Sequence, residues 1–159
     1  MGLTDEAGPL LLHLLEQAYD RKAWHGPNLR GSLRGLTASE AAWRPRPGRH
    51  SVWELALHCA YWKYAVLRKL TGAQRGSFPR KPSNFPGLPQ PADAKAWTTD
   101  LALLDRMHRD LVQATTRYLD GATRDPKIIR LIEGVACHDV YHAGQIRLLI
   151  RLSGAKKRG

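Results

Sequence analysis

The sequence predicts an all-α protein that folds as an antiparallel four-helix bundle. Four long segments carry apolar residues at the three- to four-residue spacing of an amphipathic helix, and stretches rich in glycine and proline separate them. The chain has 159 residues and a mass of 17.8 kDa, which suits one domain with four helices of bundle length. We therefore expect one bundle domain over residues 1–154 and a short basic tail at residues 155–159.

The first helix is expected from Asp5 to His25, because a Gly-Pro pair follows and stops it. Its predicted apolar face consists of Leu10, Leu11, Leu14, Leu15 and Ala18. A single helical turn is expected near residues 36–40, with Thr37 or Ser39 as its N-cap. A proline-rich stretch then separates this turn from the second long helix.

The other three long helices are expected at residues 51–70, 93–118 and 126–152. Residues 71–91, between the second and third of these four helices, contain five prolines and three glycines and show little periodicity. Such composition predicts a long surface loop. We expect this loop to cover one end of the bundle and to contribute to specificity.

Two histidines four residues apart, His138 and His142, lie in the last predicted helix. At this spacing their Cβ atoms are about 5–6 Å apart on one helix face, so both imidazoles can bind one metal ion. Apolar residues share that face, which indicates that the histidines point into the bundle; they are Ile128, Leu131, Ile132, Val135, Ile146 and Leu149. Buried imidazoles need polar partners, and the pattern alone allows a metal ion, backbone carbonyls or each other.

A third histidine, His58, borders the inward face of the second long helix. That face is formed by Val52, Leu55, Cys59, Trp62 and Val66. Three inward histidines on two helices match a metal site with three protein ligands and an open position for water or substrate. This arrangement favours catalysis over a purely structural metal, and three imidazoles suit zinc, nickel, copper or iron.

Two polar residues near these histidines are candidate site residues. Gln145 lies three residues after His142, where it could hydrogen-bond a ligand imidazole or a metal-bound water, or simply pack at the core edge. Glu54 lies four residues before His58 on the same helix face. It could orient that histidine, act as a general base or pair with a surface cation, and we favour a structural role.

Three aromatic residues are also close to the histidines in the sequence, namely Tyr61, Trp62 and Tyr141. We treat them as candidates for lining a substrate pocket beside the metal. Aromatic residues at helical spacing also fill bundle cores, so packing in the core is the alternative role for these three residues.

Charge and composition limit the class of partner. The formal net charge of +11 permits nucleic acid, an anionic membrane surface or an acidic small molecule. The basic residues are spread over every element without the aromatic-interleaved motif of a nucleic-acid module, so we expect a small-molecule substrate and no nucleic acid. No apolar run approaches 20 residues and no signal-peptide pattern is present, which predicts a cytoplasmic protein without membrane association.

The residues from His138 to Ile146 resemble a signature of the DinB-like superfamily, a group of metal-binding four-helix bundles that includes metal-dependent thiol transferases. That signature is His-x-x-x-His-x-Gly-Gln-Ile in the last helix, paired with a histidine of the second long helix, here His58 after Ser51-x-x-Glu54. The resemblance covers nearly the full length of the chain. It implies that His58, His138 and His142 bind a divalent metal, usually zinc or nickel.

The resemblance also implies an activity. Members of this superfamily transfer a low-molecular-weight thiol such as bacillithiol or mycothiol to an electrophilic small molecule, and homodimers are common among them. Metal-dependent hydrolysis is the enzymatic alternative. A non-catalytic metal-binding module with a role in stress response, in which the metal only stabilises the fold, is the alternative of another class.

Overall fold

The computed structural model describes residues 3–122 and 124–154, and within these residues the regular structure is entirely helical. The helices are α1 (Leu3–Tyr19), α2 (Leu29–Ser32), α3 (Ala38–Ala42), α4 (Val52–Thr71), α5 (Ala94–Leu119) and α6 (Pro126–Leu152). The predicted all-α bundle with a long loop between the second and third long helices is thereby confirmed. The predicted basic tail, residues 155–159, lies outside the described residues.

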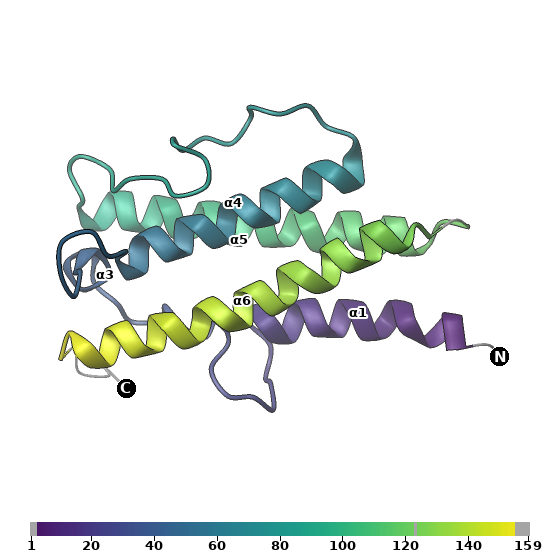
Figure 1. The fold of residues 1–159 in the computed structure, drawn as a ribbon, viewed down its shortest axis with the longest axis horizontal. Helices are drawn as coiled ribbons and strands as arrows, with labels where there is room; N and C mark the ends of the chain where they lie inside the picture. The colour runs from purple at the N-terminus through teal and green to yellow at the C-terminus, as the bar shows by residue number, and fades with distance from the viewer. Residues whose placement is uncertain (1–2, 123, 155–159) are drawn as a thin grey trace.

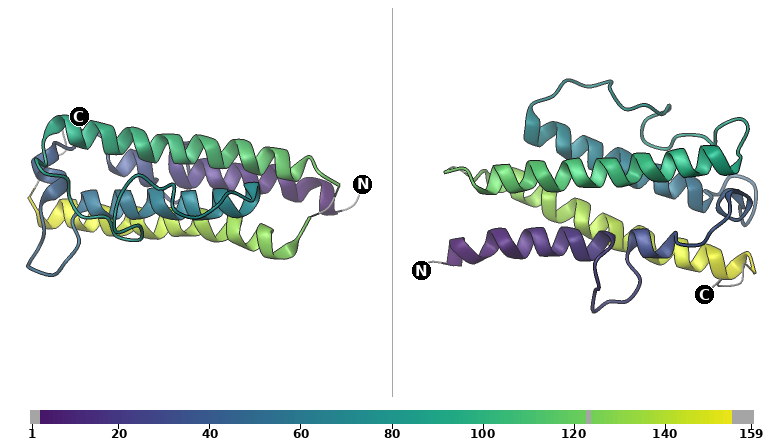
Figure 2. Two further views of the ribbon diagram at one scale, coloured as in Figure 1. Left: turned by 90° about the horizontal axis from the view of Figure 1, so that it is seen from above. Right: turned by 180° about the vertical axis from the view of Figure 1, so that it is seen from behind.

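The four long helices α1, α4, α5 and α6 lie side by side along one axis (Figures 1 and 2). The antiparallel arrangement holds between α4 and α6 and between α1 and α5. The consecutive helices α4 and α5 run parallel, and Trp53 near the start of α4 packs against Trp97 near the start of α5. Residues 72–93 must therefore return along the length of the bundle, as the long loop in Figure 1 shows.

Local capping interactions set the ends of the long helices. Ser51 and Glu54 form a capping box at the start of α4, and Gly72 ends this helix with a φ of 69°, a left-handed conformation that glycine adopts readily. The Asp93 side chain caps α5, and Asp125 caps α6. These helices accordingly begin and end within a residue or so of the predicted positions.

The predicted end of the first helix was wrong, because α1 ends at Tyr19 and not at His25. Residues 20–27 contain no buried apolar side chain that would pack a further helical turn against the bundle, and the Trp24 side chain is 99% exposed. The Asn28 side chain donates to the Arg21 carbonyl and caps the short helix α2, which the sequence analysis missed. The single turn capped by Thr37 is present as α3.

Three residues assigned to inward helix faces also proved to be exposed. Leu10 is 68% exposed on α1, Trp62 is 40% exposed on α4 and Leu131 is 39% exposed on α6. Each lies at the margin of a helix face, where the helical period alone does not separate core from surface. The exposed flank formed by Trp62 and Leu131 belongs to the cavity described below.

An ion pair anchors the loop of residues 72–93 to the bundle. Arg80 of this loop pairs with the buried carboxylate of Asp100 on α5. The same carboxylate accepts a hydrogen bond from the Trp53 indole at 2.8 Å. Asp100 thus joins α4, α5 and the loop, which fixes the loop to this part of the bundle.

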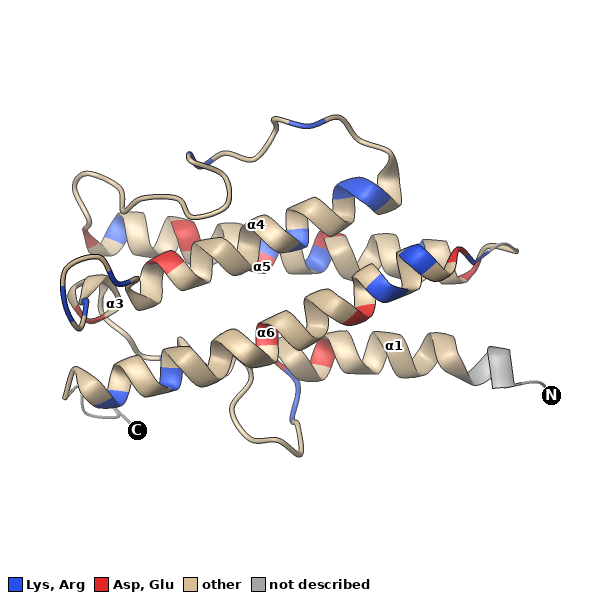
Figure 3. Cartoon of the chain, viewed as in Figure 1, with Lys and Arg blue, Asp and Glu red and all other residues tan. Residues whose placement is uncertain are grey.

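Charged side chains are distributed over all the long helices and the loop (Figure 3). Lysine and arginine cluster where α4 ends, in the following loop and near the start of α6. Within the described chain, none of the helices has the length and apolar character needed to cross a membrane.

Candidate metal centre

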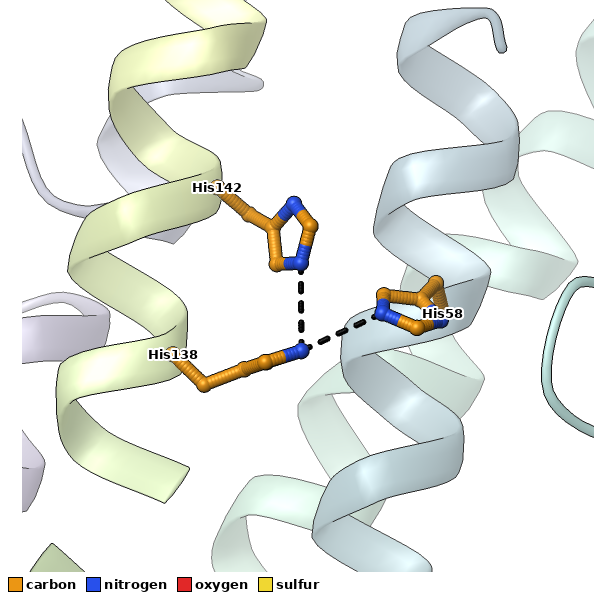
Figure 4. A group of neighbouring side chains, drawn as sticks. All are labelled: His58, His138 and His142. Carbon is orange, nitrogen blue, oxygen red and sulfur yellow. Dashed lines mark hydrogen bonds between the residues drawn. The ribbon is translucent and has the colours of Figure 1, made fainter. Parts of the chain in front are cut away.

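The three predicted histidines converge between α4 and α6 (Figure 4). The Nε2 atom of His138 lies 3.1 Å from the Nε2 atom of His58 and 3.1 Å from that of His142. His138 and His142 are one turn apart on α6, and the antiparallel α4 brings His58 opposite them. The arrangement predicted from spacing and inward orientation is therefore present, with candidate ligand atoms within 4.8 Å of one another.

Hydrogen bonds at the outer ring nitrogens orient two of the imidazoles. The Nδ1–H of His58 donates to the backbone carbonyl of Asn84 at 2.7 Å. The Nδ1–H of His142 donates to the side-chain oxygen of Gln145 at 2.7 Å, and the amide nitrogen of Gln145 donates to the Tyr141 hydroxyl. Because each Nδ1 carries a proton, the Nε2 lone pairs of His58 and His142 both point toward His138.

His138 cannot hydrogen-bond to both of the Nε2 lone pairs that point toward it. Its Nδ1 atom is buried and has no hydrogen-bond partner among the described residues. A neutral imidazole carries one proton, so His138 can satisfy one neighbouring lone pair at most and leaves the other facing a nitrogen. A divalent cation would accept the lone pairs of all three Nε2 atoms, so this donor set fits a metal ion such as zinc or nickel.

The surroundings keep the three imidazoles neutral. Burial, followed by repulsion from His142 and His58, lowers the pKa of His138 to about 3. Burial and the neighbouring His58 lower the pKa of His142 to about 4, and burial lowers the pKa of His58. Neutral imidazoles are the form that binds metal, so no proton has to be released at neutral pH.

The loop of residues 72–93 supplies two residues of the centre that the sequence analysis missed. Asn84 accepts the His58 hydrogen bond, and Phe85 stacks on the His58 ring with 3.9 Å between centroids. His50 stacks on Phe85 as well, at 4.1 Å. The available signal was compositional, since both phenylalanines of the chain, Phe78 and Phe85, lie in this otherwise polar and proline-rich loop.

The contacts of Glu54 are those of a helix cap. Its carboxylate accepts hydrogen bonds from the Ser51 backbone and from Arg44, each at 2.8 Å, and His50 lies 3.9 Å away. Within the described residues, no hydrogen bond joins Glu54 to His58. These contacts agree with the structural role favoured from the sequence.

The three candidate aromatic residues lie around the centre at different depths. The Trp62 ring lies 6.1 Å from the His138 ring, and Tyr61 packs edge-on against Trp62. Tyr141 is 63% exposed and meets His142 edge-on at 5.0 Å, while its hydroxyl accepts the hydrogen bond from Gln145. Tyr61 and Trp62 are therefore placed to contact a small molecule, and Tyr141 is placed to support His142 through Gln145.

A second group of possible ligands consists of Cys59, His138 and Asp139, and it shares His138 with the first group. Asp139 forms an ion pair with Lys63, and both side chains are completely buried. Burial raises the pKa of the Cys59 thiol, which has no exposed surface. Because the carboxylate already has a cationic partner and the thiol disfavours ionisation, we assign the candidate metal centre to the three histidines.

One of the three histidines, His138, borders an open cavity of about 1120 Å³ between α4, α6 and the loop. Its wall includes His138 together with Trp62 and Tyr61 on the α4 side and Val135 on the α6 side. A cavity of this size admits a small molecule to the edge of the metal centre.

The fold and the site together define a helical bundle with a candidate three-histidine metal centre. The sequence model of the DinB superfamily matches residues 22–146. The chain therefore belongs to the DinB superfamily, as its histidine signature indicated. A search of the curated proteins gave no match, and a search of the solved structures gave none either.

Proposed function

We propose that this protein is a metal-dependent enzyme that transfers a low-molecular-weight thiol to an electrophilic small molecule. The observation that carries the proposal is the convergence of three neutral imidazoles, one of which, His138, lines a cavity large enough for a substrate. Membership of the DinB superfamily supports it, because the resemblance of the histidine signature to this superfamily implies thiol transfer. His58, His138 and His142 are the proposed metal ligands.

A divalent metal held by these histidines would lower the pKa of a bound thiol and so favour the nucleophilic thiolate. Asn84 and Gln145 keep the ligand imidazoles in the required tautomer through their hydrogen bonds to Nδ1. Trp62 and Tyr61 provide apolar surface that limits the access of water to the reacting groups. We propose no role for Glu54 in proton transfer, since its carboxylate is engaged at the helix start.

The proposal is tested with zinc- or nickel-loaded protein and panels of small thiols and electrophiles. We expect metal-dependent turnover in the wild type and in the control His13→Ala, which alters an exposed residue of α1, and none in folded His142→Ala. Circular dichroism checks that each variant is folded.

Two outcomes would contradict thiol transfer in favour of the alternatives. Ester hydrolysis without any thiol, also lost in His142→Ala, would identify a hydrolase. A folded, metal-loaded wild type that is inert toward both the thiol and the ester panel would identify a non-catalytic metal-binding module.

We further propose that the protein is a cytoplasmic homodimer. The support for the dimer is the resemblance to the superfamily, and the support for the location is the composition of the sequence. Sedimentation velocity tests the dimer, since a particle with the 17.8 kDa mass of a single chain would contradict it.

A further inference from the structure

The wall of the open cavity carries charge of one sign. Its cationic residues are Arg68, Lys69, Arg75, Arg80, Lys81 and Arg130. No aspartate or glutamate is among the described residues that line it. Glu133 precedes the lining residue Gly134 on α6 but does not itself belong to the wall.

Most of these cations have no counterion among the described residues of the protein. Arg80 pairs with Asp100, which anchors the loop. No ion pair joins any of the other five to a carboxylate in the part of the chain that the structure describes. Several unpaired cations around one concave surface produce a positive potential that attracts anions.

The cations lie at a defined distance from the histidines. Arg130 precedes His138 on α6 by two helical turns, or about 12 Å. On the antiparallel α4, Arg68 and Lys69 follow His58 by about three helical turns, or about 15–17 Å. Figure 3 shows the basic positions at the end of α4 and near the start of α6 at the same end of the bundle, and those of the loop along its length.

The wall between the cations and the metal centre is apolar and aromatic. It includes Val66, Tyr61 and Trp62 on α4, and Leu131 and Val135 on α6. A ligand that follows this wall meets imidazole nitrogens, then carbon surface, and then guanidinium and ammonium groups. A molecule that complements the whole cavity therefore has an apolar middle part and an anionic end.

We infer that the cavity binds an elongated anionic small molecule, with its reactive group at the metal centre beside His138 and its carboxylate or phosphate about two to three helical turns away, at Arg68, Lys69 and Arg130. The loop cations Arg75 and Lys81 add to the attraction from the open side. The placement of the reactive end rests on the proposed function. The preference for an anion rests only on the charge of the wall.

The inference is tested by isothermal titration calorimetry of zinc-loaded protein with two ligands of matched length, 8-mercaptooctanoate and 8-mercaptooctan-1-ol. At low ionic strength we expect the carboxylate to bind at least about tenfold tighter, because hydrogen bonds to charged groups are the stronger ones. The affinity of the short anion 3-mercaptopropionate should exceed that of 3-mercaptopropan-1-ol by a much smaller factor, because its carboxylate does not reach the cations.

Charge-neutralising variants locate the anion site. In Arg68→Gln combined with Arg130→Gln we expect the preference for the carboxylate to fall to about twofold or less. The matched control is Arg151→Gln, on an exposed position near the far end of α6, which should keep the full preference. Equal binding of the two ligands to the wild type, or equal losses in the control and the double variant, would overturn the inference.

A second pair of ligands, octanoate and octan-1-ol, separates this inference from the proposed function. A carboxylate preference in both ligand pairs, without any thiol turnover, would support the anion site and contradict thiol transfer. Thiol turnover without a carboxylate preference in either pair would contradict the anion site and leave the proposed function standing.

Discussion

The ring of Phe85 lies nearly parallel to the imidazole of His58, with 3.9 Å between the centroids and 8° between the planes. The neighbouring Asn84 carbonyl accepts the hydrogen bond from His58 Nδ1. Two successive residues of a loop thus hold one candidate metal ligand from its face and from its edge. The position of this loop and the geometry of the metal centre are therefore coupled.

Replacement of Phe85 by alanine is expected to weaken metal binding about tenfold, because His58 loses the surface that restricts its rotation. Competition with a chromophoric chelator measures the affinity. The control Gln74→Ala, at an exposed position of the same loop, should bind metal like the wild type. Unchanged affinity in Phe85→Ala would show that the stacking does not orient the ligand.

Gln145→Ala is expected to lower metal affinity by about tenfold, because His142 Nδ1 loses its acceptor and the imidazole loses its fixed tautomer. Gln145→Glu keeps an acceptor at the same place and should restore most of the affinity. Tyr141→Phe removes only the group that orients the amide, so a smaller effect is expected. The same chelator competition compares the three variants, and equal affinities for Ala and Glu would contradict the assignment.

Metal content provides a direct test of the three ligands. Protein purified without chelators should contain about one transition metal ion per chain, and His58→Ala and His138→Ala should each lose it, since a three-ligand site rarely survives with two. Elemental analysis gives the stoichiometry, with His13→Ala as control. Full retention of metal by both variants would place the metal elsewhere.

The buried pair of Lys63 and Asp139 is expected to make a large difference to stability when only one partner is removed. Lys63→Met should lower the free energy of unfolding by about 3–5 kcal/mol, because it leaves a buried carboxylate without a counterion. Removing both charges in Lys63→Met combined with Asp139→Leu should recover most of this loss. Urea unfolding measures both values, and a single variant as stable as the wild type would contradict the prediction.

His108 predicts a dependence of stability on pH. Burial, followed by repulsion from Lys63, lowers its pKa far below the ordinary value of 6.5, so the folded protein keeps it neutral. Below that value the unfolded chain binds a proton that the folded protein does not bind. The free energy of unfolding therefore falls as the pH decreases, by up to about 1.4 kcal/mol per pH unit from this group.

The variant His108→Phe removes this titration and can still stack on Tyr19. Urea unfolding of metal-free protein between about pH 7 and about pH 5 should show a smaller loss of stability in the variant than in the wild type. The exposed control His13→Gln should follow the wild type. Identical slopes in all three proteins would show that the pKa of His108 is not lowered in the folded state.

The parts of the structure that the sequence predicted well are those fixed by local interactions. Capping residues such as Ser51 and Asp125 set helix ends within a few residues of themselves. The spacing of His138 and His142 fixed their common face, and the apolar pattern around His58 indicated its orientation. Each of these signals is contained in one helix.

The parts that the sequence did not predict depend on contacts between distant segments. The stacking of Phe85 on His58 and the pairing of Lys63 with Asp139 join residues 27 to 76 positions apart. No periodicity or cap reports such contacts, because each exists only after the helices have packed.

The parallel direction of α4 and α5 has a consequence for how this protein can change over evolutionary time. A connection between parallel neighbours has to travel the length of the bundle, and a few side chains anchor it, among them Arg80 on Asp100 and the buried Phe78, while many of its other positions are exposed. Residues 72–93 also contribute to the metal centre and to the cavity wall. Substitutions in this connection can therefore diversify ligand preference while the helical scaffold keeps its packing.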